Sequence, residues 1–244
     1  MPIKFTPFVI EKIINETHDT KTFRLKNVEG RPMFFKPGQF VNMYILKEDG
    51  SFADARSMSI SSSPTITGYI DLTIKIVPDG RFTPKLLPFK LGDKFGINGP
   101  FGRSFNFSED DLKKHFVLIA GGVGITPLMC IIRYVINKKA STKMILLYSN
   151  KTPKDIIYYE ELNKLESLNG NLKVVNTVTR PHESATEWHG LTGRINEDLI
   201  RKHVHDISNT MFFLCGPDTM IKELIETLKK MGASDSQIKF EKWG

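Results

Sequence analysis

The segment AGGVGITPL, residues 120–128, has the composition of a turn that holds a phosphate group. Its three glycines allow the backbone to approach a ligand closely, and an apolar strand precedes them. Thr126 and Pro127 then predict the start of a helix, with Thr126 as N-cap and Pro127 as first helical residue. The free N–H groups at a helix start attract a pyrophosphate. Taken alone, the segment is equally compatible with a tight turn that binds nothing.

A second strand end, FLCGPDTM at residues 213–220, repeats this design. Gly216 makes the turn and Pro217 begins a helix, so Cys215 is expected at the strand tip, facing a crevice. A buried, inert thiol is the alternative, because free cysteine behaves as a small hydrophobic residue. A nucleophilic role needs a nearby histidine, and no histidine motif accompanies Cys215. The sequence therefore argues against covalent catalysis.

Two segments of the first half could also bind anions. Arg56 stands in ARSMSISSSP among small and apolar residues, where a guanidinium needs an anionic partner. In GRFTPKLL, Thr83 as N-cap and Pro84 as first helical residue predict a short helix, whose start is a second candidate phosphate site. A serine-rich edge strand and a capped turn are the structural alternatives.

The printed sequence ends on KFEKWG, which places a tryptophan, Trp243, next to last. One interpretation is a final strand pinned by Phe240 and Trp243. The other is that Trp243 covers a flat aromatic ligand.

The elements that position these residues differ between the two halves. The first half predicts six short strands separated by turns, which indicates a small antiparallel barrel. In the clearest strand, Asp71, Thr73 and Lys75 alternate with apolar residues, which predicts one solvated and one buried face. The predicted strands are 8–16, 21–27, 38–46, 55–61, 69–77 and 93–99.

The second half alternates strands with helices, which predicts parallel βαβ units and a five-stranded parallel sheet. Ligands of such sheets bind beyond the carboxyl ends of the strands. We therefore expect two domains, 1–108 and 109–244. The predicted strands are 115–122, 143–150, 172–179, 210–216 and 237–243, and the predicted helices are 126–139, 155–168, 196–204 and 217–232.

Composition excludes several classes of protein. The 244 residues are 40% hydrophobic, with no apolar run long enough to span a membrane and no signal peptide. Two cysteines without CxxC spacing predict neither a disulfide framework nor a metal site, so a cytoplasmic location is expected. The net charge is +7, with 15 basic and 10 acidic residues in 1–108, but the charges are dispersed and do not indicate nucleic-acid binding.

The order of these motifs resembles the ferredoxin–NADP reductase superfamily over nearly the whole chain. The series is RSMS, GxxTxxL, GPFG, AGGVGITP, CGP and a terminal glutamate followed by an aromatic residue. The resemblance implies an antiparallel Greek-key β-barrel that binds FAD, followed by an α/β domain that binds NADPH or NADH. It also implies that the protein is a flavin-dependent reductase.

The resemblance implies a role for each matching residue. Ser59 would lie near flavin N5, Cys215 and Glu241 beside the nicotinamide, and Trp243 against the isoalloxazine ring. The implied catalytic residues are Ser59, Cys215 and Glu241. The implied FAD-binding residues are Arg56, Ser57, Met58, Ser59, Ile60, Ser61, Lys75, Gly80, Thr83 and Trp243. The implied NAD(P)H-binding residues are Gly121, Gly122, Val123, Gly124, Thr126, Thr179, Arg180, Cys215, Gly216 and Pro217.

Two positions bear on the cofactors. Met58 stands where the family usually has a tyrosine against the flavin, which predicts a looser hold on FAD. Arg180 follows Thr179 where NADPH-using members carry an arginine for the 2′-phosphate, which slightly favours NADPH.

Iron–sulfur ligation needs about four thiolates, and the chain has two cysteines, so we expect no built-in cluster. Electrons would then pass to a separate small acidic protein such as a ferredoxin, rubredoxin or flavodoxin. The alternatives are reduction of free flavin, ferric chelates or a cytochrome, a relay role within a larger complex, and a non-enzymatic remnant of the fold. The oligomeric state is left open.

Overall fold

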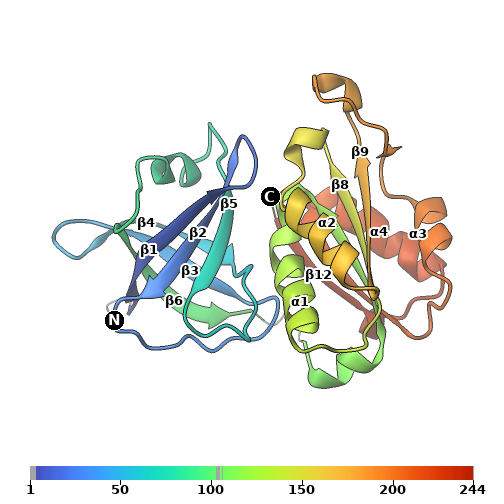
Figure 1. Ribbon diagram of the computed structural model, residues 1–244, viewed down its shortest axis with the longest axis horizontal. Coiled ribbons are helices and arrows are strands. Elements are labelled where there is room, and N and C mark those ends of the chain that lie inside the picture. The colour runs from blue at the N-terminus through green and yellow to red at the C-terminus, as the bar shows by residue number, and fades with distance from the viewer. Residues whose placement is uncertain (1–3, 103–104, 106, 244) are drawn as a thin grey trace.

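The computed structural model describes residues 4–102, 105 and 107–243, the last without its side chain. The two halves of the chain form two lobes that lie side by side (Figure 1). One lobe is a β-barrel and the other is a parallel sheet covered by helices, as the sequence predicts.

The barrel contains six antiparallel strands within the described residues, in the order β4-β3-β6-β1-β2-β5. An isolated antiparallel bridge between Ile60 and Leu72 links the β4 end of this order to β5. The core of the barrel is apolar and includes the buried rings of Phe8, Phe23 and Phe95. The strands are β1 (Thr6–Asn15), β2 (Thr20–Asn27), β3 (Phe40–Leu46), β4 (Phe52–Ser59), β5 (Ile70–Lys75) and β6 (Lys94–Phe101).

The second sheet is parallel throughout its described pairs and has the order β10-β9-β8-β7-β11-β12. It has six strands where the sequence predicts five. The additional strand is a two-residue segment, too short to carry a periodic pattern. The strands are β7 (His115–Gly121), β8 (Met144–Asn150), β9 (Leu172–Val178), β10 (Leu191–Thr192), β11 (Thr210–Pro217) and β12 (Ile238–Trp243).

Helices cover both faces of the parallel sheet. Residues of α1 (Ile125–Asn137) and α2 (Tyr159–Leu168) pack in one apolar cluster, and residues of α3 (Glu197–His203) and α4 (Asp218–Lys230) pack in another (Figure 1). None of the helices in the described residues combines the length and apolarity that a bilayer span requires. The short 3-10 helices are η1 (Thr83–Leu86), η2 (Glu109–Lys113), η3 (Gly122–Gly124), η4 (Pro153–Asp155), η5 (Pro181–Glu183) and η6 (Asp235–Gln237).

The predicted helix 155–168 begins later than expected, at Tyr159. Thr152 and Asp155 form a capping box around η4, and this short helix ends at Asp155. Ile156 and Ile157 are buried in the apolar core instead of starting a helix. Tyr158 then adopts a left-handed backbone with φ of 61°, which redirects the chain into α2. A local turn therefore overrides the helical pattern.

The face of β5 that the sequence predicts to be solvated is buried over much of its length. Asp71 is 3% exposed and Thr73 is 5% exposed, because side chains of the neighbouring strand β2 and of the second half of the chain cover this face. The hydroxyl of Tyr158 donates a hydrogen bond to Thr73 Oγ1, and Arg24 donates two hydrogen bonds to Asp71. The alternation of apolar and polar residues is thus confirmed, while the expected exposure is wrong.

Polar side chains connect the two halves. Arg133 of α1 donates from Nη1 to the backbone oxygen of Ser61, over 2.8 Å. The same guanidinium binds both carboxylate oxygens of Glu161 in α2, at 2.8 and 2.6 Å. Asn137 donates to Thr65 Oγ1 across the junction at 2.9 Å. These contacts fix the barrel against the first helix of the second half.

Candidate functional site

A cleft of about 650 Å³ lies between the two halves and is called the main cleft here. Strand β4 of the barrel forms one wall. The turn after β7 and the ends of β11 and β12 form the other. The residues that line it are Phe40, Arg56, Ser57, Met58, Ser59, Thr73, Val123, Thr126, Pro127, Cys215, Phe240, Glu241 and Lys242.

Strand β4 presents four consecutive predicted residues, Arg56 to Ser59, to the main cleft. Ser57 Oγ donates to Asn42 Oδ1 at 2.8 Å, which holds this part of β4 against β3. Within the part of the chain that the structure describes, Arg56 forms no ion pair and its side chain is exposed. A positive charge that lacks a protein partner in a cleft fits an anionic ligand such as a pyrophosphate.

The glycine-rich turn runs directly from β7 into α1. Glycine is needed at Gly124, because a Cβ there would lie 2.2 Å from the carbonyl oxygen of Cys215. Gly122 has a positive φ of 51° and nothing within 4 Å of where its Cβ would be. The turn therefore packs tightly on β11 at one glycine and leaves open space at another, which leaves room for a ligand near the backbone.

The helix begins two residues earlier than the predicted N-cap at Thr126 implies. The 3-10 turn η3 continues directly into α1, so Gly124 takes the N-cap position and Ile125 is the first helical residue. Thr126 lies inside the first turn, where its hydroxyl donates to Val123 O at 2.6 Å. Thr126 as N-cap is thus wrong, although Thr126 and Val123 both line the main cleft.

Cys215 and Glu241 meet at the main cleft. In the sheet, Cys215 of β11 pairs with Ala120 of β7 on one side and with Glu241 of β12 on the other. Burial, and to a smaller extent the negative charge of Glu241, raise the pKa of the Cys215 thiol far above its usual range. The thiol is therefore neutral at physiological pH, which agrees with the argument against a nucleophilic cysteine.

Several predicted FAD residues lie outside the main-cleft lining. Ile60 is fully buried in the barrel core, and Ser61 is buried where its hydroxyl bonds Asp71 O and Thr73. Lys75 pairs with Asp19 at 2.8 Å and Asp155 at 3.7 Å.

The segment around η1 also differs from the prediction. The 3-10 helix starts at Thr83 itself, so Phe82 takes the N-cap position that the sequence assigns to Thr83. Thr83 Oγ1 instead accepts a hydrogen bond from the Val77 N–H at 3.0 Å, and Gly80 lies in the same turn. The hydroxyl stabilises the turn and does not cap the helix.

The remaining predicted nucleotide residues lie along the carboxyl edge of the parallel sheet. Thr179 and Arg180 follow β9, and their backbone N–H groups bond the carbonyls of Asn150 and Lys151 at 2.9 and 2.7 Å. The Arg180 side chain is exposed, and its ion-pair partner among the described residues is Glu183 at 3.4 Å. Gly121, Gly122, Gly124, Gly216 and Pro217 stand at the ends of β7 and β11 without being part of the main-cleft lining.

Sequence reasoning missed part of the lining. Phe40 begins β3 beside Ser59, and Thr73 lies on the face of β5 that was expected to be solvated. Lys242 and Phe240 reach the main cleft because β12 pairs with β11 up to Pro217. The alternation in β5 was a signal for Thr73, and the aromatic residues of the final strand were a signal for Phe240. Trp243 pairs with Pro217 through its backbone, and its predicted contact with a flavin lies outside the described residues.

Comparison with known proteins agrees with this architecture. A family model of an oxidoreductase FAD-binding domain matches residues 7–106, and a model of an oxidoreductase NAD-binding domain matches residues 118–225. The chain belongs to the ferredoxin–NADP reductase superfamily. The resemblance of the ordered motifs is thereby confirmed at the level of the two matched domains.

Several proteins named as reductases are similar to this chain over nearly its full length. The glycine betaine monooxygenase reductase subunit of Chromohalobacter salexigens is 33% identical over 96% of this chain and 62% of its own length. An NADH-cytochrome b5 reductase-like protein of Arabidopsis thaliana is 29% identical over 91% of this chain and 68% of its own length. This chain thus spans less than two thirds of the first relative.

A solved structure of the superfamily shows the same fold. The ferredoxin NADP+ reductase of Neisseria gonorrhoeae, with bound FAD and NADP, superposes with a TM-score of 0.81 at 22% identity. The superposition covers 99% of this chain and 99% of the reductase chain.

Proposed function

We propose that this protein is an FAD-dependent NAD(P)H oxidoreductase that delivers electrons to a separate acceptor. The barrel half holds the flavin and the second half binds NAD(P)H. The observation that carries the proposal is the main cleft, where Arg56 to Ser59 of the barrel face Cys215 and Glu241 of the nucleotide half. We place the boundary between the halves near residue 108, between the end of β6 and the start of β7.

The flavin would supply the redox chemistry, since it accepts a hydride and gives up single electrons. The residues of this chain would bind the two cofactors and orient them toward each other. Arg56 is proposed to neutralise the FAD pyrophosphate, and the η3 turn with the start of α1 to hold that of NAD(P)H. Ser59 and Glu241 are proposed to hydrogen-bond near the reacting atoms, and the neutral Cys215 thiol to pack beside the nicotinamide.

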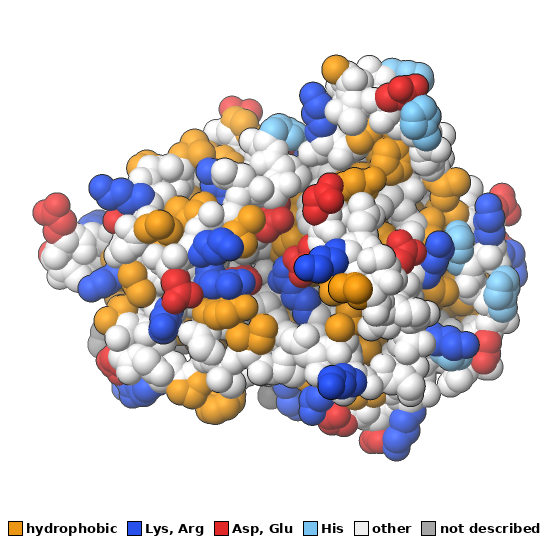
Figure 2. Space-filling model, in the orientation of Figure 1, with side chains coloured by type: hydrophobic (Ala, Val, Ile, Leu, Met, Phe, Trp, Pro, Cys, Tyr) orange, Lys and Arg blue, Asp and Glu red, His pale blue; other side chains and the backbone are white. Residues whose placement is uncertain are grey.

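We propose a small acidic redox protein of the ferredoxin, rubredoxin or flavodoxin type as the acceptor. Two observations support it. The net charge is +7, with the excess mainly in the barrel half, and the similar proteins include a reductase subunit of a monooxygenase. Long-range attraction between opposite charges speeds such encounters. On the face shown in Figure 2, basic and acidic side chains are interspersed, so the steering field would come from the net charge.

A haem protein is the second candidate acceptor. The Arabidopsis thaliana relative named as NADH-cytochrome b5 reductase-like favours it.

The first test is an absorbance spectrum of the purified chain before and after anaerobic NADPH and NADH. A bound yellow flavin that bleaches supports the proposal, and a chain that retains no added FAD contradicts it. Stopped-flow oxidation by a ferredoxin, a flavodoxin and cytochrome b5, with ferricyanide as control, then separates the acceptors. Exchanging Lys12, Lys26 and Lys94 for glutamate should slow only the protein acceptors; an equal loss with ferricyanide contradicts steering.

A further inference from the structure

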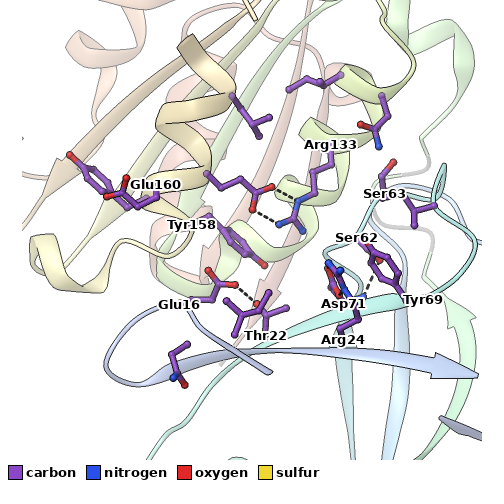
Figure 3. Close-up of a pocket in the computed structure, with 18 residues that line it drawn as sticks. Glu16, Thr22, Arg24, Ser62, Ser63, Tyr69, Asp71, Arg133, Tyr158 and Glu160 are labelled. Atoms are coloured by element: carbon purple, nitrogen blue, oxygen red, sulfur yellow. Dashed lines mark hydrogen bonds and ion pairs between the residues drawn. The ribbon is translucent and has the colours of Figure 1, made fainter. Parts of the chain in front are cut away.

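A second cleft, of about 570 Å³, also lies between the two halves (Figure 3). Glu16 and Thr22 of the barrel line it from one side, and Arg133 and Tyr158 line it from the other. Thr73 lines the main cleft and lies directly opposite Thr22 in the barrel sheet. The wall between the two clefts is therefore thin at this pair of threonines.

Hydrogen bonds run through this wall without a break. Thr22 Oγ1 lies 2.6 Å from Thr73 Oγ1 and 2.6 Å from Glu16 Oε1. The contact between Glu16 and Thr22 is visible in Figure 3, with Tyr158 approaching from the other half. The hydroxyls of Tyr158 and Ser61 also contact Thr73 Oγ1. A chain of hydroxyls thus links a carboxyl group in the second cleft to the main cleft.

The direction of these bonds follows from the number of protons. Each hydroxyl has one proton to donate. With Glu16 ionised, Thr22 donates to the carboxylate, so Thr73 must donate to Thr22 and accept from Tyr158. With Glu16 protonated, the carboxyl donates and the order reverses. Such a chain can carry one proton from end to end, because each oxygen accepts one proton and passes on its own.

Glu16 is suited to the end of this chain. Its burial raises its pKa, and the charges of Glu161 and Asp71 act in the same direction, against the Thr22 hydrogen bond and the charge of Arg133. Arg133 binds Glu161 and Arg24 binds Asp71, so both guanidinium groups already have carboxylate partners. Glu16 therefore holds a proton at a higher pH than an ordinary glutamate and releases it toward the second cleft.

The reaction under the proposed function produces a proton in the main cleft. A hydride carries two electrons and one proton, and two one-electron acceptors remove only the electrons. One proton per NAD(P)H must therefore leave the protein.

We propose that Thr73, Thr22 and Glu16 form a proton exit from the main cleft to the second cleft. Thr73 Oγ1 takes a proton in the main cleft and gives its own to Thr22. Thr22 gives its proton to the Glu16 carboxylate, which releases it to water. The inference rests on the proposed function for the source of the proton, while the hydroxyl chain stands on the geometry alone.

The test uses the FAD-loaded full chain and the Thr22→Val variant, which removes the central hydroxyl and nearly keeps the side-chain shape. Thr20→Val is the matched control, because Thr20 is a buried threonine of the same strand whose hydroxyl bonds Asp19 and not Thr73. Flavin absorbance reports the electrons that leave to ferricyanide, and a pH-sensitive dye reports the proton.

For Thr22→Val, we expect proton release to lag electron departure by at least about tenfold, with reduction by NAD(P)H within about twofold of the unsubstituted chain. Thr20→Val should show no lag. Proton release that stays in step with the electrons in Thr22→Val would mean that the proton leaves through the mouth of the main cleft, and would overturn the proposal.

A second measurement needs no turnover. Carbon-13 NMR of labelled glutamate follows the titration of Glu16 in the full chain with and without FAD. Thr22→Val removes a hydrogen bond to the carboxylate, so the pKa of Glu16 should rise, while Thr20→Val should leave it unchanged. An unchanged Glu16 titration in Thr22→Val would overturn the chain of hydroxyls. If neither nucleotide reduces the flavin of the unsubstituted protein, the proposed function fails. The NMR titration still tests whether the hydroxyl groups of Thr73 and Thr22 are linked to Glu16.

Discussion

Cys215 and Glu241 lie side by side on neighbouring parallel strands, and both line the main cleft. The carboxylate thereby adds to the effect of burial and keeps the thiol protonated. The pair places a neutral sulfur next to an acidic group where the two halves of the chain meet.

The first prediction concerns the reactivity of Cys215. Because its pKa is raised, the reactive thiolate forms only at a pH well above the ordinary thiol value of ~8.5. In the native protein at pH 8, iodoacetamide should leave Cys215 unmodified, as measured by peptide mass spectrometry, while urea-unfolded protein reacts fully. Glu241→Gln removes the negative charge, so the pKa should fall and native modification become faster. Equal rates in native and unfolded protein would contradict the neutral thiol.

The second prediction concerns Arg56 and FAD. Arg56→Gln removes the positive charge from the β4 wall of the main cleft. A hydrogen bond to a charged group contributes about 1.5–3 kcal/mol, so the Kd for FAD should rise by roughly 10- to 100-fold. Isothermal titration calorimetry measures it, and the loss should shrink at high salt. Arg31→Gln, an exposed arginine paired with Glu29, is the control and should bind FAD normally.

The third prediction compares two glycines of the η3 turn. In Gly124→Ala the new Cβ collides with the carbonyl of Cys215, so the free energy of unfolding should fall by about 3 kcal/mol. In Gly122→Ala only the positive φ is unfavourable, and the loss should be about 1 kcal/mol. Urea unfolding measures both, and a larger loss for Gly122→Ala would contradict the geometry of the turn.

The fourth prediction concerns the junction between the halves. Arg133→Gln leaves Glu161 without its bidentate partner and loses the bond to Ser61 O. The Arg133 side chain is 17% exposed but that of Glu161 is 38% exposed, so solvent screens the pair in part and the free energy of unfolding should fall by about 1–2 kcal/mol. Arg201→Gln breaks an exposed pair with Glu197 and should cost no more than ~0.5 kcal/mol. Comparable losses in the two variants, measured by urea unfolding, would show that the junction does not depend on Arg133.

The fifth prediction concerns the choice of nucleotide. If Arg180 binds a 2′-phosphate, Arg180→Gln should lower kcat/KM for NADPH by about tenfold and leave that for NADH unchanged. Lys173→Gln, at the opposite end of β9, should change neither. An equal effect on both nucleotides would assign Arg180 a structural role.

Much of the fold follows from local patterns. The predicted strands of both halves lie within a few residues of those observed, because period-two alternation and apolar runs in β/α units are strong signals. The start of α2 was not predictable from periodicity, since Ile156 and Ile157 fit a helix as well as an extended segment, and the capping box of Thr152 decided between them. The short strand β10 carries no pattern at all.

The site was predictable where a motif carries the chemistry and not where packing creates it. Arg56, Cys215 and Glu241 were identified from residue type and order, and the structure brings them to one cleft. The alternation in β5 predicts that Thr73 faces solvent. The sequence of a single strand does not reveal that another part of the chain covers its polar face. The burial of Thr73 comes from contacts with residues more than fifty positions away, such as Thr22 and Tyr158.

The strand order β7-β11-β12 has a consequence for how the protein acquires its active form. Ala120, Cys215 and Glu241 are adjacent in space but far apart along the chain, and the barrel wall comes from still earlier residues. Contacts between such distant segments form slowly during folding. The main cleft therefore forms only when both sheets are complete. A partly folded chain can have an apolar core but does not yet have the main cleft.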